Sequence, residues 1–191
     1  MTGEPEIDDS DLLARAVDGD EESFTLLYRR RQGAVYRFAL QMSGRRSVAE
    51  EVTQEVFLAI VREPGRFDAR RGPVLSYLYG IARNHVLRCL ERDRPYVAIE
   101  EEQESDMARW AAAEDTLGDL TRGETVEALR RAVLALPTAF REAVVLCDLH
   151  EMSYADAATA MDCAVGTVRS RLHRARAMLL EKLKAKKRAF A

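Results

Sequence analysis

The stretch at residues 152–176 reads MSYADAATAMDCAVGTVRSRLHRAR and predicts two short helices joined by a tight turn. Ser153 is a favourable N-cap, because its hydroxyl can accept a backbone N–H of the first helical turn. Asp156, three residues later, completes a variant of the capping box. An alanine-rich helix to about Met161 is therefore expected. A four-residue turn follows, and the next helix is predicted to start near Gly166.

The second helix of this pair is predicted to be amphipathic. Its inward stripe has apolar residues at helical spacing: Val168, Leu172, Ala175 and Leu179. The candidate DNA-binding residues lie on or beside the opposite stripe: Thr167, Arg169, Ser170, Arg171, His173 and Arg174. This pattern is typical of a helix-turn-helix, whose second helix enters the major groove and uses arginine to read guanine edges or contact phosphates. The alternative is a basic surface helix without a partner, but the combined cap, turn and arginine spacing favours DNA.

Composition indicates an all-α protein. Ala, Leu, Glu and Arg dominate, and the five prolines, at positions 5, 64, 73, 95 and 137, fall between periodic segments. The 191 residues are enough for one domain or two small ones. The formal net charge is only −3, but two acidic segments, 1–28 and 93–128, alternate with two basic segments, 29–92 and 166–191.

Four helices are expected in the first half of the chain, over about residues 10–17, 20–42, 47–63 and 73–92. Asp20 is the expected N-cap of the second helix. Ser47, with Glu50 three residues later, predicts a capping box for the third. We expect these helices to form one bundle over residues 1–92.

A change of composition separates this bundle from the rest of the chain. Residues 93–120 hold an acidic cluster without sustained periodicity, and we interpret them as a flexible acidic linker. Thr121 and Glu124 then predict a capping box that opens a helix, and Pro137 begins another. The expected fold is thus two small helical bundles joined by the linker, with the helix-turn-helix in the second bundle, residues 121–191.

The third helix presents polar and apolar side chains beside its core stripe: Glu51, Gln54, Glu55 and Leu58. Carboxylates and an amide at spacings of three and four residues can meet arginines on a partner protein. The alternative is a helix face that contacts only solvent.

The fourth helix and the basic loop before it hold a second set of candidates: Phe67, Tyr77, Arg83, Asn84 and Arg88. Aromatic rings can stack on unpaired bases, an amide can bond to base edges, and guanidinium groups can bind phosphates, so this set fits a single DNA strand. Gly80 leaves room on this face for a close approach. Tyr79 is expected to cap the bundle core instead.

Five segments then carry a resemblance to a known family. The segments LPTAFREAVVL, SYADAA and VGTVRSRLHRAR resemble region 4 of bacterial sigma factors of the extracytoplasmic-function (ECF) group. AEEVTQEVFL resembles the segment that docks on the clamp helices of RNA polymerase, and GIARN the promoter-melting region. One departure is Tyr77, where the family commonly has tryptophan. The resemblance covers nearly all of residues 24–183 except the linker.

The resemblance implies a transcription initiation factor. It implies that Glu51, Gln54 and Glu55 contact core RNA polymerase, that the first bundle binds and melts the −10 element of promoter DNA, and that the second reads the −35 element. The linker would thread the polymerase cleft, and an inhibitory anti-sigma partner is usual in the family. The alternatives are a stand-alone helix-turn-helix regulator and a helical adaptor without DNA.

Other function classes find no support in the sequence. The three cysteines lack CxxC spacing and the three histidines lie in separate segments, so neither a metal site nor a catalytic arrangement is expected, and no cofactor. No apolar run approaches the roughly 20 residues that span a bilayer, and the start of the chain is not a signal peptide. We therefore predict a cytoplasmic protein that is not an enzyme and does not insert into a membrane.

Overall fold

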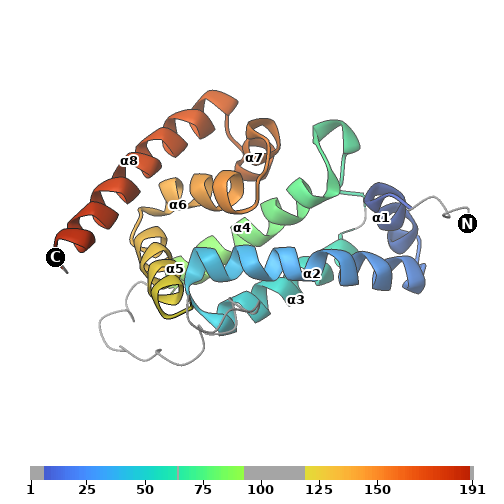
Figure 1. Ribbon diagram of the computed structural model, residues 1–191. Coiled ribbons are helices and arrows are strands. Elements are labelled where there is room, and N and C mark those ends of the chain that lie inside the picture. Colours follow the sequence, from blue (N-terminus) through green and yellow to red (C-terminus); the bar gives the residue numbers. More distant parts are fainter. Residues whose placement is uncertain (1–6, 64, 93–118, 190–191) are drawn as a thin grey trace, which may run out of the picture.

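The computed structural model describes residues 7–63, 65–92 and 119–189, and their side chains except those of 119–124 and 185–189. These parts are helical without strands, as the sequence predicts (Figure 1). The first bundle consists of four α-helices and a short 3-10 turn: α1 (Asp9–Val17), α2 (Glu21–Ser43), α3 (Arg46–Arg62), η1 (Ala69–Arg71) and α4 (Val74–Arg92).

The ends of these helices are fixed by local chemistry. The Asp20 carboxylate accepts the backbone N–H groups of Glu22 and Ser23, which confirms it as the cap of α2. Gly44 ends α2 in the left-handed conformation, with φ 72°. The predicted capping box of α3 at Ser47 is wrong, because α3 already begins at Arg46 and Arg45 is its N-cap.

The reason for this early start lies in the preceding turn. The Ser43 hydroxyl accepts the Arg45 backbone N–H at 3.2 Å, so the chain reverses within two residues of α2. Ser47 is thus inside the first turn of α3 and exposed to solvent.

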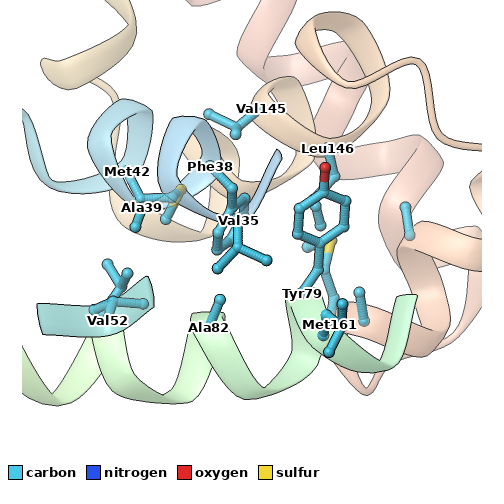
Figure 2. Close-up of a cluster of buried hydrophobic side chains, with 14 of the residues drawn as sticks. Val35, Phe38, Ala39, Met42, Val52, Tyr79, Ala82, Val145, Leu146 and Met161 are labelled. Carbon is cyan, nitrogen blue, oxygen red and sulfur yellow. The ribbon is translucent and has the colours of Figure 1, made fainter. Parts of the chain in front are cut away.

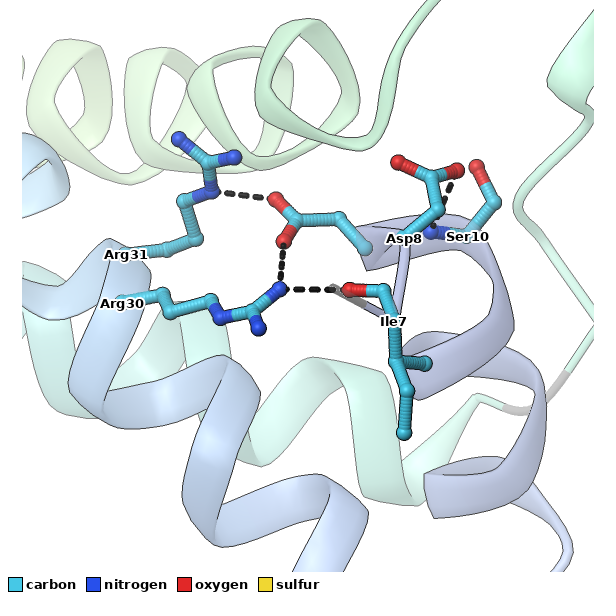
Figure 3. Close-up of polar contacts among 6 residues, drawn as sticks. Ile7, Asp8, Ser10, Arg30 and Arg31 are labelled. Carbon is cyan, nitrogen blue, oxygen red and sulfur yellow. Dashed lines mark hydrogen bonds and ion pairs between the residues drawn. The ribbon is translucent and has the colours of Figure 1, made fainter. Parts of the chain in front are cut away.

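The N-terminal helix is held to α2 by a buried carboxylate (Figure 3). Asp9 is 7% exposed and forms ion pairs with Arg30 and Arg31. The Arg30 guanidinium also donates to the Ile7 carbonyl at 2.6 Å. Because each charge has a partner, burial of Asp9 does not leave an uncompensated anion.

The second bundle follows the helix-turn-helix prediction. Its elements are α5 (Asp119–Leu134), α6 (Thr138–Val144), the π-helical turn η3 (Val145–Leu149), α7 (Tyr154–Met161) and α8 (Val165–Ala189). The Ser153 hydroxyl accepts the Asp156 N–H at 3.0 Å, which confirms the predicted cap of α7. Thr121 is not the start of α5, because that helix begins two residues earlier. The predicted linker lies mostly outside the described residues.

The two bundles pack directly against each other. Helices α6 and α7 lie over α2 and α4 (Figure 1). One continuous hydrophobic core results, in which Phe38 and Met42 of the first bundle lie close to Val145 and Leu146 of the second (Figure 2). Tyr79, 1% exposed, belongs to this core as predicted. Its ring lies 5.2 Å from that of Phe38, between centroids.

None of the described helices combines the length and the apolar composition needed to cross a membrane.

Candidate nucleic-acid interfaces

A cleft of about 540 Å³ runs along one face of α4. All five residues predicted to bind an unpaired strand form part of its lining: Phe67, Tyr77, Arg83, Asn84 and Arg88. The rings of Phe67 and Tyr77 lie 5.6 Å apart between centroids, at 53° to each other. They form an aromatic wall, and both rings are half-buried. The structure therefore brings the predicted stacking groups to one place.

Polar groups lie farther along the same helix. Asn84 and Arg88 are exposed and lie one helical turn apart. Arg88 Nε donates to the backbone carbonyl of Asn84 at 3.3 Å, which leaves the Asn84 side-chain amide out of this bond. Burial raises the pKa of the Tyr77 phenol, so that this group stays neutral at physiological pH. The cleft thus offers an aromatic surface, an amide and a cation, in that order along α4.

Arg83 is held by the second bundle. Its Nε lies 3.0 Å from Glu142 Oε1, and Nη2 lies 3.4 Å from Oε2, a bidentate arrangement across the interface. Glu142 of α6 is 2% exposed. Burial raises the pKa of its carboxyl, while Arg83 and then Arg171 oppose that rise. In this arrangement the Arg83 guanidinium is bound to a carboxylate rather than free to bind phosphate.

The second bundle also forms a wall of the cleft. A Cβ atom added at Gly80 would lie 3.6 Å from the carbonyl oxygen of Ala160 in α7. Thr159 of α7 donates its hydroxyl to the Arg71 carbonyl at 3.0 Å. The sequence predicted a close approach at Gly80, and in the structure it is α7 that approaches.

The predicted recognition helix has the expected two sides. Its inward residues Val168, Leu172, Ala175 and Leu179 are buried, at 9% exposure or less. The residues on its outward side are exposed to solvent: Arg169, Ser170, His173 and Arg174. Thr167 and Arg171 are half-buried, and Arg171 Nη1 lies 4.0 Å from Glu142. Arg171 is therefore the member of this set least available to DNA.

The predicted polymerase face lies along α3. Glu51 and Gln54 are exposed, whereas Glu55 and Leu58 are half-buried. Both acids are in long ion pairs, Glu51 with Arg92 at 3.8 Å and Glu55 with Arg62, about two turns farther along, at 3.7 Å. Solvent-exposed pairs of this length contribute little free energy, so they can exchange for partner arginines.

Glu142, which contacts both candidate DNA interfaces, was not among the residues predicted from the sequence. A signal for it was present. Arg141 and Glu142 interrupt the otherwise apolar run from Ala139 to Cys147, and charged residues inside such a run are buried only with partners. Arg141 is likewise committed to the interface, with hydrogen bonds to the carbonyls of Met42, Leu134 and Leu136.

The comparisons with known proteins agree with this geometry. The family model described as Sigma-70 region 2 matches residues 27–95, and that described as Sigma-70, region 4 matches residues 126–179. The ECF RNA polymerase sigma factor SigM of Mycobacterium tuberculosis is 35% identical over 179 residues, which cover 93% of this chain and 85% of that protein. The chain is a sigma factor of the ECF group. The predicted resemblance is thereby confirmed.

Matches to other relatives of this sigma factor span different shares of those proteins. The ECF RNA polymerase sigma factor SigE of Mycolicibacterium smegmatis is 34% identical over 167 residues, and the match spans 84% of this chain but only 62% of that protein. Two solved structures resemble the fold. CnrH in complex with the cytosolic domain of CnrY has a TM-score of 0.67 at 26% identity, covering 93% of this chain and 97% of that chain. Bartonella quintana RpoE with the anti-sigma factor NepR has a TM-score of 0.65 at 25% identity, covering 85% and 98%.

Proposed function

We propose that this sigma factor binds core RNA polymerase through α3, captures the unpaired −10 strand in the cleft on α4, and reads the −35 element with α8. The observation that carries the proposal is the joining of Phe67, Tyr77 and Asn84 in one cleft. A regulator that binds only closed duplex has no use for such a cleft, since stacked and paired bases do not present their faces to protein.

The chemistry of the cleft suits an extruded base. Opening the duplex costs a few kcal/mol for each displaced base, and a stack on an aromatic ring returns about 1 to 3 kcal/mol. The Phe67 and Tyr77 rings provide that stack, the Asn84 amide can bond to a base edge, and Arg88 can bind the backbone phosphate. Tyrosine in place of the family's usual tryptophan provides a smaller ring, so we expect weaker stacking at Tyr77.

The recognition helix suits duplex DNA. Arg169, Ser170, His173 and Arg174 share the exposed side of α8, while the apolar stripe fixes the helix on its bundle. Arginine can bond in bidentate fashion to guanine or bind phosphate, and each good base contact contributes about 1 to 3 kcal/mol of discrimination.

The polymerase contact is electrostatic in character. Glu51, Gln54, Glu55 and Leu58 place acidic, amide and apolar groups side by side on α3, and a basic helical partner would complement them. Because RNA polymerase and promoter DNA are in the cytoplasm, the protein acts there. It needs no catalytic residue or cofactor of its own, since the polymerase carries out the chemistry. An anti-sigma factor is a further proposed partner, as in the structure of Bartonella quintana RpoE with NepR.

The test is reconstitution. Purified chain and core polymerase are mixed with a promoter library, and run-off transcripts together with permanganate reactivity of unpaired thymines identify the opened sequences. Selective transcripts that depend on the chain are expected. A chain that binds duplex promoters but neither associates with core polymerase nor yields open thymines contradicts the proposal.

A further inference from the structure

His150 lies at the junction of the two bundles, directly after η3. Its Nδ1 is 2.7 Å from the Tyr79 hydroxyl of α4, and its Nε2 is 2.8 Å from Gln41 Oε1 of α2. Both ring nitrogens of this second-bundle residue are thus bonded to the first bundle. The Phe38 and Tyr79 rings pack edge-on against the imidazole, at 6.2 and 5.1 Å between centroids.

These contacts suit a neutral imidazole. Gln41 Oε1 can only accept, so Nε2 carries the proton and donates. Nδ1 is then the acceptor, and the Tyr79 hydroxyl donates to it. Burial raises the pKa of Tyr79 to about 12, which keeps that hydroxyl protonated. Protonation of Nδ1 would turn the acceptor into a second donor, so the Tyr79 oxygen would have to accept and the Tyr79 O–H would lose its acceptor in this contact.

The charges around His150 also oppose protonation. From α2, Arg37 places a cation where it disfavours an imidazolium, and from α4 the facing titratable group is the neutral Tyr79. Glu151, next in the chain, is exposed. Within the described parts of the chain, His150 forms no ion pair with a carboxylate. A charged imidazole at this site would therefore lack a counterion.

The same interface occupies residues that DNA needs. Glu142 holds Arg83, and α7 packs on Gly80 at the wall of the cleft. While the bundles stay packed, an unpaired strand cannot bind Arg83 without displacing a buried carboxylate. Separation of the bundles would free both the guanidinium and the cleft.

We propose that His150 is an acid-sensitive latch between the two bundles, and that protonation of its imidazole separates α6 and α7 from α2 and α4. The consequence for DNA, though not the latch itself, rests on the proposed function of the cleft. We define the latch as His150 with Tyr79 and Gln41.

The sign and size of the effect follow from linkage. Burial first, and Arg37 second, lower the pKa of His150 in the packed arrangement from 6.5 to about 4. After separation, His150 meets solvent and regains its ordinary pKa. The packed arrangement is therefore fully stabilised above pH 6.5 and loses that stabilisation as the pH falls toward 4. Between pH 7.5 and 5.5 the ratio of separated to packed molecules rises about tenfold.

Single-molecule energy transfer on the full chain measures this ratio directly. Dyes are placed at two exposed positions, Thr25→Cys on α2 and Ala177→Cys on α8, with the three native cysteines replaced by serine. We expect the low-transfer population to grow about tenfold, relative to the high-transfer one, from pH 7.5 to 5.5. His150→Gln, which cannot protonate, should show no such change. An equal ratio at both pH values in the parent chain overturns the latch.

A second variant gives protonated His150 a counterion and leaves the proposed DNA-binding residues unchanged. Gln41→Glu places a carboxylate beside Nε2, so protonated His150 gains a counterion in the packed state. Its ratio of separated to packed molecules should stay level or fall in acid. A rise equal to that of the parent chain would falsify the assignment of the latch to His150, even if His150→Gln failed to fold.

Binding of a single-stranded promoter oligonucleotide, followed by fluorescence anisotropy at both pH values, tests the consequence. Parent chain should bind up to about tenfold more tightly at pH 5.5, whereas His150→Gln should not. An energy-transfer change without any change in strand binding supports the latch and counts against the proposed role of the cleft. Unchanged energy transfer with normal strand binding counts against the latch alone.

Discussion

Arg83 and Glu142 form an ion pair across the two bundles, with Nε 3.0 Å from Oε1. Arg83 is a candidate DNA contact on α4, and Glu142 is a buried acid of α6 that also lies 4.0 Å from Arg171 on the recognition helix. One carboxylate thus neutralises an arginine from each candidate DNA interface. In the packed arrangement Arg83 is therefore paired with Glu142, in place of the DNA phosphate that we propose it binds.

Replacing this acid should both weaken the packing and release the arginine. Glu142→Gln preserves volume but removes charge-assisted hydrogen bonds, each of which contributes about 1.5 to 3 kcal/mol. We expect the free energy of unfolding to fall by about that amount in urea titrations, while affinity for single-stranded promoter DNA rises. The matched control is Glu50→Gln, whose carboxylate pairs with Arg46 on the surface and is 59% exposed. That change should cost about 0.5 kcal/mol or less. Equal stability of the two variants would contradict the role of Glu142.

Arg171 and Arg174 of α8 should behave differently. Arg174 is exposed, so Arg174→Ala should reduce promoter binding by about 1 to 3 kcal/mol, or relax preference at one base pair, with unchanged thermal stability. Arg171→Ala should also lower the melting temperature, because it leaves Glu142 with one partner fewer. Arg176→Ala is the control, since its guanidinium already bonds to Asp148 at 2.5 Å. Promoter binding unaffected by Arg174→Ala would remove this side of α8 from DNA recognition.

The polymerase face can be tested by charge reversal. Gln54→Arg combined with Glu55→Arg should weaken binding to core polymerase at least tenfold, because a charge-assisted contact is replaced by repulsion. Circular dichroism should remain that of the parent chain. Glu181→Arg, an exposed acid on α8, reverses a charge elsewhere and should leave core binding unchanged. Parent-like affinity of the double variant, measured by fluorescence titration with core enzyme, would show that α3 is not the dock.

Variants of the cleft residues should affect the opening of promoter DNA but not the binding of the closed duplex. Holoenzymes with Asn84→Ala or Phe67→Ala should still bind promoter duplex but open it poorly, since the stacking and edge contacts exist only with unpaired bases. Permanganate footprinting measures opening, and a gel-shift assay measures duplex binding. A template with a pre-melted bubble should restore much of the activity. Normal opening by both variants would exclude the cleft from melting, and equal loss on both templates would indicate a folding defect.

Much of the molecule follows from local sequence. Helix caps at Asp20 and Ser153 appear where short-range patterns predict them, because a cap depends on atoms two or three residues away. The exposed and buried sides of α8 follow from a period of 3.6 residues. The same reasoning failed at Ser47, where the turn made by Ser43 and Gly44 started α3 earlier than the capping pattern indicated.

The packing of the bundles was decided by tertiary structure alone. Arg83 and Glu142 are 59 residues apart, Tyr79 and His150 71, and Gln41 and His150 109. No periodicity or spacing rule links residues at such separations. The sequence alone determined which helices form and which side of each helix is apolar, because those depend on neighbours within a turn or two. Whether an arginine is available to DNA or is paired with a carboxylate depends on how the surfaces of the two bundles pack, and only the tertiary structure decides that.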